Sequence, residues 1–429
     1  MSDEIKADEI TADKPTVAAK VASTAVSPAR SAAKLLRPSR RAVLTGLGAA
    51  ATLPLFGRFN IVRAQGAPLK VGLMLPYSGT FAQLGENITS AFELLIAQKG
   101  GTLGGRALEI IKLDDESNPA KGPENMKRLV DRDMVDVVVG TVHSGVLMGM
   151  LQVARESGTL LIIPNAGAGA ATGAQCAPNI FRSSFSNWQP AYGCGRIAAD
   201  AGYKKLAYVT WDYAAGKESA AGFEEGAKEK GAEVVQVLTV PFPETNFQPI
   251  LAQLPGLGVD AVGAFYAGGG AVQFIKDYAA AGLKDKLPLI ASGFATDGTL
   301  GALGSVADGL VTGLHYADGL DTPTDNAFRA AFKEKAGREA DVYAVQGYDA
   351  GQLLAAGLEA VQGDFDETDA LHKAIAGAKL DSPRGPMTLS PSHNPVHNIY
   401  RRVVKNGMNV VDGVAVEALA DPGVGCSMT

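Results

Sequence analysis

Lys70-Val71-Gly72-Leu73-Met74-Leu75 is followed by a short loop, Pro76 to Gln83, and then by a helix-like stretch from Leu84 to Lys99. The first segment is a short apolar run with the length and composition of a buried strand. A strand, a loop and a helix in this order form the unit from which α/β folds with parallel sheets are built. This stretch therefore predicts the fold class of the chain.

The same unit recurs along most of the chain. Most of the apolar runs are continuous rather than alternating, as in strands that helices cover on both faces. Ligands bind to such sheets at the loops that follow the strand C-termini. The predicted strands are Lys70–Leu75, Leu108–Leu113, Val135–Gly140, Leu160–Pro164, Leu206–Thr210, Glu233–Val240, Ala261–Tyr266, Leu289–Ala291 and Leu310–Leu314. The predicted helices are Leu84–Lys99, Gly122–Arg132, Val146–Glu156, Trp188–Ala201, Ala214–Lys230, Phe247–Leu254, Ala271–Ala281 and Thr324–Lys335.

The first 64 residues differ from the rest of the chain. Arg40 and Arg41 stand directly before an uncharged run of small and apolar residues, Val43 to Phe56. That run is shorter than the roughly 20 residues that cross a bilayer as a helix. The layout resembles a twin-arginine export signal. Small side chains around Ala64 predict cleavage there, so the mature protein is expected to start near Gln65 in the periplasm.

Composition excludes several classes of protein. The chain has 429 residues, enough for two domains, and its 46% apolar and 20% charged residues are typical of a globular protein. The first 64 residues hold ten of the 39 basic and five of the 45 acidic residues, so the remainder carries a formal charge of −11. That balance argues against a nucleic-acid partner.

The cysteines leave two readings open. Cys176 and Cys194 can pair in an oxidising compartment or remain two unpaired, small apolar side chains. Cys426 lies in a segment expected to be a frayed tail.

Several short motifs follow one another in an order that resembles the branched-chain amino acid family of type I periplasmic binding proteins. The likeness covers about Leu69 to Val411. The motifs are Met74 to Gly85, Asp114-Asp115, Val139 to Ser144, Ile163 to Ala166, Phe181-Arg182-Ser183, Gly293-Phe294 and Gly347 to Ala350. The segments Ala317 to Pro323, Tyr343 and Gly347-Tyr348-Asp349 are similar to the subgroup that binds aromatic acids.

The resemblance implies an α/β clamshell of two doubly wound, parallel-sheet lobes joined by three crossovers. Lobe one is placed at residues 65–187 plus 314–395, and lobe two at 188–313 plus 396–412, with 413–429 as a C-terminal tail. A ligand in the cleft between the lobes closes the clamshell, and a membrane ABC permease recognises the closed form. No cofactor and no metal is expected.

The family's ligand-binding loops match loops after strand ends in both lobes. Free backbone N–H groups at a strand end that opens into a helix favour a carboxylate. Trp211 and Phe265 are expected to be core residues rather than ligand contacts. The predicted ligand-binding residues are Tyr77, Phe81, His143, Ser144, Asn165, Ala166, Gly167, Tyr213, Tyr266, Phe294 and Asp297.

One departure from the family concerns the ligand. Amino-acid-binding members have an acidic residue where this chain has Gly293-Phe294, because a buried ammonium group needs a counter-charge. Phe294 cannot supply it, and Asp297 lies three residues later. The resemblance therefore implies a small aromatic carboxylate of the hydroxybenzoate or hydroxycinnamate type. The alternative is a branched-chain or other aliphatic amino acid or amide.

The sequence argues against two other classes of protein. The sequence has no G-x-S-x-G, Walker or H-E-x-x-H motif, so nothing organises a nucleophile and no enzyme is predicted. His393 and His397 are expected to be solvated loop residues rather than metal ligands. A receptor's sensing domain would need a membrane helix or signalling domain after the second lobe, and the segment from Asp412 to Thr429 is too short for one.

Overall fold

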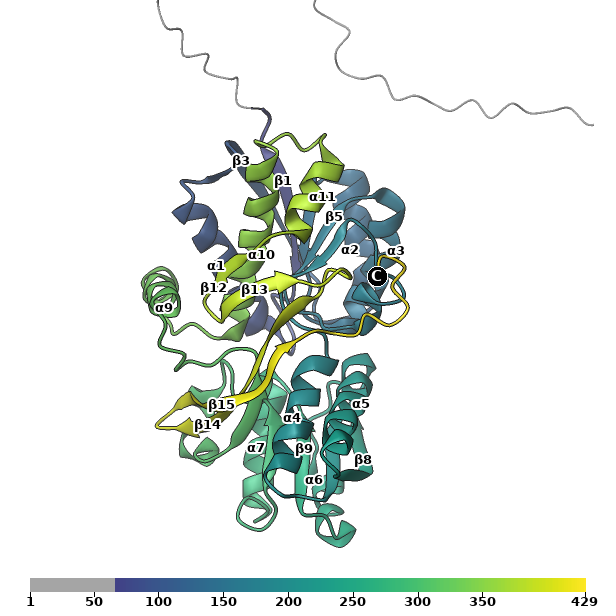
Figure 1. The fold of residues 1–429 in the computed structure, drawn as a ribbon, viewed down its shortest axis with the longest axis vertical. Helices are drawn as coiled ribbons and strands as arrows, with labels where there is room; N and C mark the ends of the chain where they lie inside the picture. Colours follow the sequence, from purple (N-terminus) through teal and green to yellow (C-terminus); the bar gives the residue numbers. More distant parts are fainter. Residues whose placement is uncertain (1–65) are drawn as a thin grey trace, which may run out of the picture. The chain divides into compact units, whose positions relative to one another are not determined.

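The computed structural model describes residues 66–429. The predicted export signal lies outside the described residues. Two sheets organise this part of the chain, and helices cover them (Figure 1). The α/β fold in two lobes is confirmed. The first sheet has six strands in the order β2-β3-β1-β4-β5-β6. The second has nine, in the order β12-β13-β14-β11-β10-β9-β7-β8, with β15 paired to β14.

All nine predicted strands form, and their bounds shift by no more than two residues. The strands are β1 (Leu69–Leu75), β2 (Thr102–Leu103), β3 (Arg106–Asp114), β4 (Val137–Gly140), β5 (Leu160–Ile163), β6 (Ile180–Arg182), β7 (Lys205–Asp212), β8 (Glu233–Pro241), β9 (Ala261–Phe265), β10 (Leu289–Ser292), β11 (Val311–Leu314), β12 (Leu380–Ser382), β13 (Gly385–Leu389), β14 (Pro395–Lys405) and β15 (Met408–Leu419). Within each lobe the predicted strands pair in parallel, while β2 and β12 to β15 add antiparallel pairs that the sequence reading did not include.

Every predicted helix forms at least in part. The helices are α1 (Ala82–Gln98), α2 (Lys121–Lys127), α3 (Ser144–Ser157), α4 (Trp188–Asp200), α5 (Ala214–Glu229), α6 (Gln248–Leu251), α7 (Gly268–Ala280), α8 (Leu300–Leu303), α9 (Pro323–Ala336), α10 (Val342–Ala360) and α11 (Thr368–Ala376). Strand β1 shows why helices are needed on both faces of the first sheet. Leu73 and Leu75 belong to one apolar cluster, whereas Met74, between them, belongs to another.

The chain passes between the lobes more than once. After β6 it leaves the first sheet and builds α4 and β7, and after β11 it returns to form α9 to α11, with α10 packed against α1. Strand β14 then runs beside β11 in the second sheet, and β14 and β15 form the long antiparallel pair in Figure 1. Strand β15 continues to Leu419, into the segment expected to be a tail.

The disulfide differs from the one considered from sequence. Cys176 is bonded to Cys426 across 250 residues of sequence, and Cys194 is a free, buried thiol. The considered pair of Cys176 with Cys194 is therefore wrong. Cys194 lies in α4, where its thiol donates to the carbonyl of Ala291 at 3.4 Å. The disulfide between Cys176 and Cys426 links the C-terminal residues to the loop that precedes β6.

Candidate ligand-binding site

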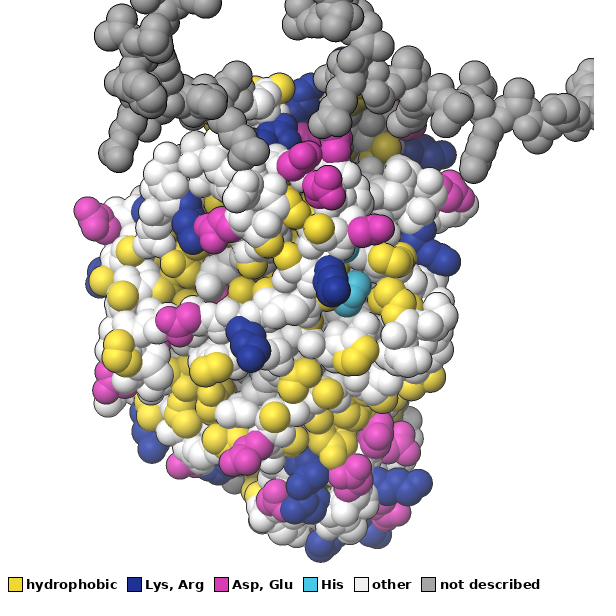
Figure 2. All heavy atoms as spheres, turned by 45° about the horizontal axis from the view of Figure 1, so that its top comes forward, with side chains coloured by type: hydrophobic (Ala, Val, Ile, Leu, Met, Phe, Trp, Pro, Cys, Tyr) yellow, Lys and Arg dark blue, Asp and Glu magenta, His cyan; other side chains and the backbone are white. Residues whose placement is uncertain are grey.

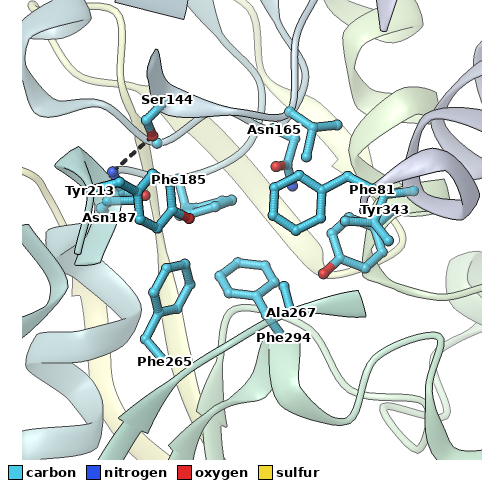
Figure 3. A pocket seen from close by; sticks show the side chains of 14 residues that line it. Phe81, Ser144, Asn165, Phe185, Asn187, Tyr213, Phe265, Ala267, Phe294 and Tyr343 are labelled. Atoms are coloured by element: carbon cyan, nitrogen blue, oxygen red, sulfur yellow. Dashed lines mark hydrogen bonds between the residues drawn. The ribbon is translucent and has the colours of Figure 1, made fainter. Parts of the chain in front are cut away.

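A small cavity lies where loops from both lobes meet. Figure 3 shows polar groups at one side of it and aromatic rings around the rest. The lining residues are Phe81, Leu84, Val142, Ser144, Asn165, Gly167, Phe185, Asn187, Tyr213, Ala215, Phe265, Ala267, Phe294 and Tyr343.

The first turn of α3 forms part of the polar side. Ser144 is the first residue of this helix, which follows β4 after a three-residue loop. The side chain of His143 caps the helix, because its Nδ1 accepts from the N–H of Gly145 at 3.0 Å. An α-helix of 14 residues carries partial positive charge at this end, which favours an anion. The cap is an uncharged ring, so that positive end is not neutralised.

His143 lies behind the cavity wall and is not part of the lining. Its side chain is 3% exposed and stacks on the ring of Tyr213, with 5.0 Å between ring centroids. Burial lowers the pKa of His143 to about 4. The imidazole is therefore neutral at physiological pH, and it supports Tyr213 and the start of α3 rather than supplying a positive charge.

Asn187 connects the polar groups of the two lobes. Its Nδ2 donates to Ser144 Oγ at 3.2 Å and to Glu218 Oε2 at 2.7 Å. The N–H of Gly169 donates to the same carboxyl group, and burial raises the pKa of Glu218. Gly167 accepts from the N–H of Asn187 at 2.7 Å, and a Cβ added there would lie 2.3 Å from Asn187 Oδ1. Only glycine allows this approach.

Asn165 completes the polar side from the loop after β5. Its Nδ2 donates to Gln346 Oε1 at 2.7 Å, which fixes the orientation of the amide. Its backbone carbonyl accepts from Ser184 Oγ at 3.2 Å. The donors and acceptors on this side are therefore held by the surrounding structure before any ligand enters.

Aromatic rings form most of the remaining wall. Phe294 is central to them, with ring centroids 4.6 Å from Phe185 and 6.2 Å from Phe265, the latter at an angle of 83°. Phe81 comes from the loop before α1, and Tyr343 from the first turn of α10. Such a wall offers both faces and edges to a flat ring.

Asp297 does not reach the cavity lining. Its carboxylate is fully buried against Arg402, with 2.7 Å between Oδ2 and Nη1, and its other oxygen accepts from the N–H of Val342 at 3.2 Å. None of the 14 lining residues is acidic. The lining therefore has no carboxylate to balance a buried ammonium group.

Six of the eleven predicted site residues line the cavity: Phe81, Ser144, Asn165, Gly167, Tyr213 and Phe294. His143 and Asp297 lie behind it, as described above. Ala166 is fully buried beside the lining. Tyr77 turns toward α1, where its hydroxyl is 2.9 Å from Thr89 Oγ1. Tyr266 lies in the core, with its ring centroid 5.0 Å from that of Trp211.

Several lining residues were not assigned from sequence. Phe185 and Asn187 follow β6, a strand of three residues that is too short to recognise as an apolar run. Tyr343 lies in the first turn of α10, a helix that was not predicted from the sequence. Phe265 was expected to be a core residue, yet it lines the cavity, whereas Trp211 lies in the core as expected. The adjacent positions Phe265 and Tyr266 therefore exchange their predicted roles.

The two histidines of the C-terminal region are not solvated, contrary to expectation. His393 is 8% exposed and stacks on Phe181 with 4.1 Å between centroids, and His397 is 5% exposed and stacks on His315 at 4.8 Å. Among residues 66–429, no cluster of three or more His, Cys, Asp or Glu side chains is placed to hold a metal ion.

Comparison with known proteins shows the family. The periplasmic binding protein model matches residues 68–408, so the chain belongs to this family of periplasmic proteins. A Leu/Ile/Val-binding protein homolog 6 from Brucella melitensis is 29% identical over 343 residues, which cover 78% of this chain and 87% of the relative. The predicted family resemblance is confirmed.

Two solved structures are especially similar. A solute-binding protein of an ABC transporter from R. palustris, in complex with benzoate, is 49% identical with a TM-score of 0.82 and covers 84% of this chain and 100% of its own. A solute-binding protein from Rhodopseudomonas palustris BisB5, in complex with 3,4-dihydroxy benzoic acid, is 32% identical with a TM-score of 0.78. The match covers 83% of this chain and 99% of that protein's chain. These relatives are solute-binding proteins rather than enzymes. In the described part of the chain, no helix has the length and apolar character needed to span a membrane.

Proposed function

We propose that this protein is the solute-binding component of an ABC importer and binds a small aromatic carboxylate of the hydroxybenzoate or hydroxycinnamate type. The observation that carries the proposal is a cavity with a positive helix end, capped only by a neutral imidazole, on one side, rings elsewhere and no acid in its lining. The similar structures with benzoate and 3,4-dihydroxy benzoic acid support the same ligand class. The protein binds its ligand without changing it.

The carboxylate lies at the start of α3. Ser144 offers a hydroxyl and the first turn of the helix offers backbone N–H groups, while Asn165 has one amide N–H beyond the one that it donates to Gln346. The ligand's ring lies among Phe185, Phe265 and Phe294. An amino acid would bring an ammonium group into the same cavity with no counter-charge in the lining, so the aliphatic amino-acid alternative is disfavoured.

The importer partner is a membrane ABC permease. Lobe one, at residues 65–187 plus 314–395, and lobe two, at 188–313 plus 396–412, close on the ligand, and the permease recognises the closed form. Figure 2 shows Lys and Arg side chains scattered among Asp and Glu on the face that it draws, rather than gathered in one basic patch. A surface of this kind suits a protein partner better than nucleic acid.

A thermal-shift experiment tests the ligand class. Benzoate and hydroxybenzoates should raise the melting temperature, because a ligand that binds only the folded state adds about 2.7 kcal/mol to stability at a concentration of 100 Kd. Leucine, isoleucine and valine at the same concentrations should leave the melting temperature unchanged. A shift with leucine and none with any aromatic acid would overturn the proposal in favour of the amino-acid alternative.

We further propose that residues 1–64 are a twin-arginine export signal cleaved after Ala64. The support is the pair Arg40-Arg41 ahead of an uncharged run. In cell fractionation, the unaltered chain should appear in the periplasm with Gln65 at its N-terminus. The double substitution Arg40→Lys and Arg41→Lys should hold it in the cytoplasm. Normal export of that variant would contradict the signal type.

A further inference from the structure

The hydroxyl of Tyr343 is a buried polar group in the cavity wall. Tyr343 is the second residue of α10 and is 1% exposed. Its oxygen has no hydrogen-bond partner within the described residues 66–429. Most buried hydroxyl groups are paired, because an unpaired one loses its water without replacement. In Figure 3 this hydroxyl points into the space beside Phe294 and Ala267, which indicates that its partner is a group on the ligand.

Tyr343 and Ser144 lie on opposite sides of the cavity. Figure 3 shows Ser144 with Asn187 on one side and Tyr343 on the other, with Phe185 and Phe294 between them. A ligand whose carboxylate lies at Ser144 therefore extends its ring toward Tyr343. The group that meets the Tyr343 hydroxyl belongs to the part of the ligand that is far from the carboxylate.

The two helix ends at the cavity differ in charge. Two carboxylates already occupy the start of α10, where the N–H of Ala344 donates to Asp341 at 2.9 Å and that of Val342 donates to Asp297 at 3.2 Å. The start of α3 is capped by the neutral ring of His143. A carboxylate is therefore favoured at α3 and repelled at α10, where only a neutral polar group fits.

The protonation state of Tyr343 agrees with this assignment. Burial raises the pKa of Tyr343 well above its usual range, and the nearby carboxylates of Asp297 and Asp341 raise it further. The phenol stays protonated, so it can both donate to and accept from a ligand hydroxyl.

We propose that Tyr343 is a specificity-determining residue that selects ligands with a hydroxyl group on the ring edge away from the carboxylate. This inference rests on the proposed binding of aromatic carboxylates. Within that class it selects acids whose hydroxyl lies on the ring edge away from the carboxylate, and it excludes diacids with a second carboxylate at that edge.

Titration calorimetry on the mature protein tests the inference. The unaltered protein should bind 3- or 4-hydroxybenzoate about tenfold more tightly than benzoate, the scale of one hydrogen bond. It should bind 4-methylbenzoate, which fills similar space without a donor, no more tightly than benzoate. Terephthalate should bind more weakly than benzoate. Salicylate, whose hydroxyl is next to the carboxylate, should show none of the tenfold gain.

The variant Tyr343→Phe removes only the hydroxyl. It should bind hydroxybenzoate about tenfold more weakly than the unaltered protein and should keep its affinity for benzoate, which also shows that the variant is folded. Tyr208→Phe is the matched control, because Tyr208 is a buried phenol that packs against Phe223 outside the cavity lining. Its affinities should equal those of the unaltered protein.

The outcomes separate this inference from the proposed function. Equal affinities of the unaltered protein for benzoate, 4-methylbenzoate and both hydroxybenzoates would overturn the role of Tyr343 and leave the aromatic-acid proposal standing. The role of Tyr343 would also be overturned if Tyr343→Phe weakened the binding of benzoate and of hydroxybenzoate alike, or if Tyr208→Phe had the same effect as Tyr343→Phe. Failure of every aromatic acid to bind the unaltered protein would overturn the proposed function itself.

Discussion

Replacing Arg402 with alanine is expected to lower the free energy of unfolding by about 3–5 kcal/mol, because it leaves the carboxylate of Asp297 buried without its partner. Both side chains are fully buried. Besides its ion pair with Asp297, the guanidinium of Arg402 donates to the carbonyls of Tyr316 and Gly293 at 2.7 and 2.9 Å and to Thr312 Oγ1 at 3.0 Å. The substitution removes all of these bonds at once.

Chemical denaturation followed by circular dichroism measures the change. Arg401 on the same strand is the matched control, because its ion pair with Asp412 is exposed. Arg401→Ala should cost no more than about 1 kcal/mol. The double variant Arg402→Met with Asp297→Leu should recover much of the lost stability, since an apolar pair of similar volume needs no counter-charge. Equal effects of the two single arginine variants would contradict this account of the buried pair.

The same ion pair shows why Asp297 was misplaced in the sequence reading. Asp297 follows the end of β10, where the loops of the site lie. Amino-acid-binding members of the family also have an acidic residue near this position. Its partner Arg402 lies 105 residues further along the chain, on β14, a strand that was not predicted. Pairing between residues so distant in sequence leaves no local pattern. The disulfide between Cys176 and Cys426 was missed for the same reason.

The parallel strands were predictable because burial on both faces makes them continuous apolar runs. The hairpin of β14 and β15 is different, since buried and partly exposed residues alternate along much of β14. Its turn, Asn406-Gly407, has φ values of 52° and 72°, and Asn-Gly is a strong hairpin signal. The Asn-Gly pair therefore marks this hairpin in the sequence, although neither of its strands was predicted.

Helix α10 lacked the pattern by which helices are recognised. Fourteen of its 19 residues are buried, so apolar and small side chains surround the helix instead of forming one stripe. Tyr343 is part of the resemblance to the aromatic-acid subgroup, but no sequence pattern places it at a helix start and therefore in the site. Tyr343 lines the cavity because α10 packs against α1.

The loops of the candidate site were predicted better than their individual side chains. Sheet topology places loops after parallel strands at one edge, which is why Ser144, Asn165 and Phe294 were found. Which of two adjacent residues faces the cavity depends on the local backbone. Phe265 ends β9 and faces the cavity, while Tyr266 turns into the core against Phe274. Sequence pattern alone does not distinguish these two orientations.

Replacing Phe294 with alanine is expected to weaken binding of benzoate by about 1–3 kcal/mol, or about 5- to 150-fold, the scale for losing a buried ring contact. Phe294 follows β10 and is 3% exposed. Its ring lies at the centre of the aromatic wall, because it contacts the rings of Phe185 and Phe265. Its centroid lies 6.0 Å from that of Tyr343. Alanine removes a ring that both contacts the ligand and positions the other rings.

Stability and affinity must be measured together to interpret this variant, because losing a buried ring also costs about 3–5 kcal/mol of folding free energy. Phe328→Ala provides the comparison. Phe328 in α9 is equally buried at 3% exposure, but it packs against Tyr348 outside the cavity lining. Both variants should lose stability, and only Phe294→Ala should lose affinity in titration calorimetry below its melting temperature. If both retain full affinity for benzoate, the ligand does not lie against Phe294, and the aromatic cavity is not the binding site.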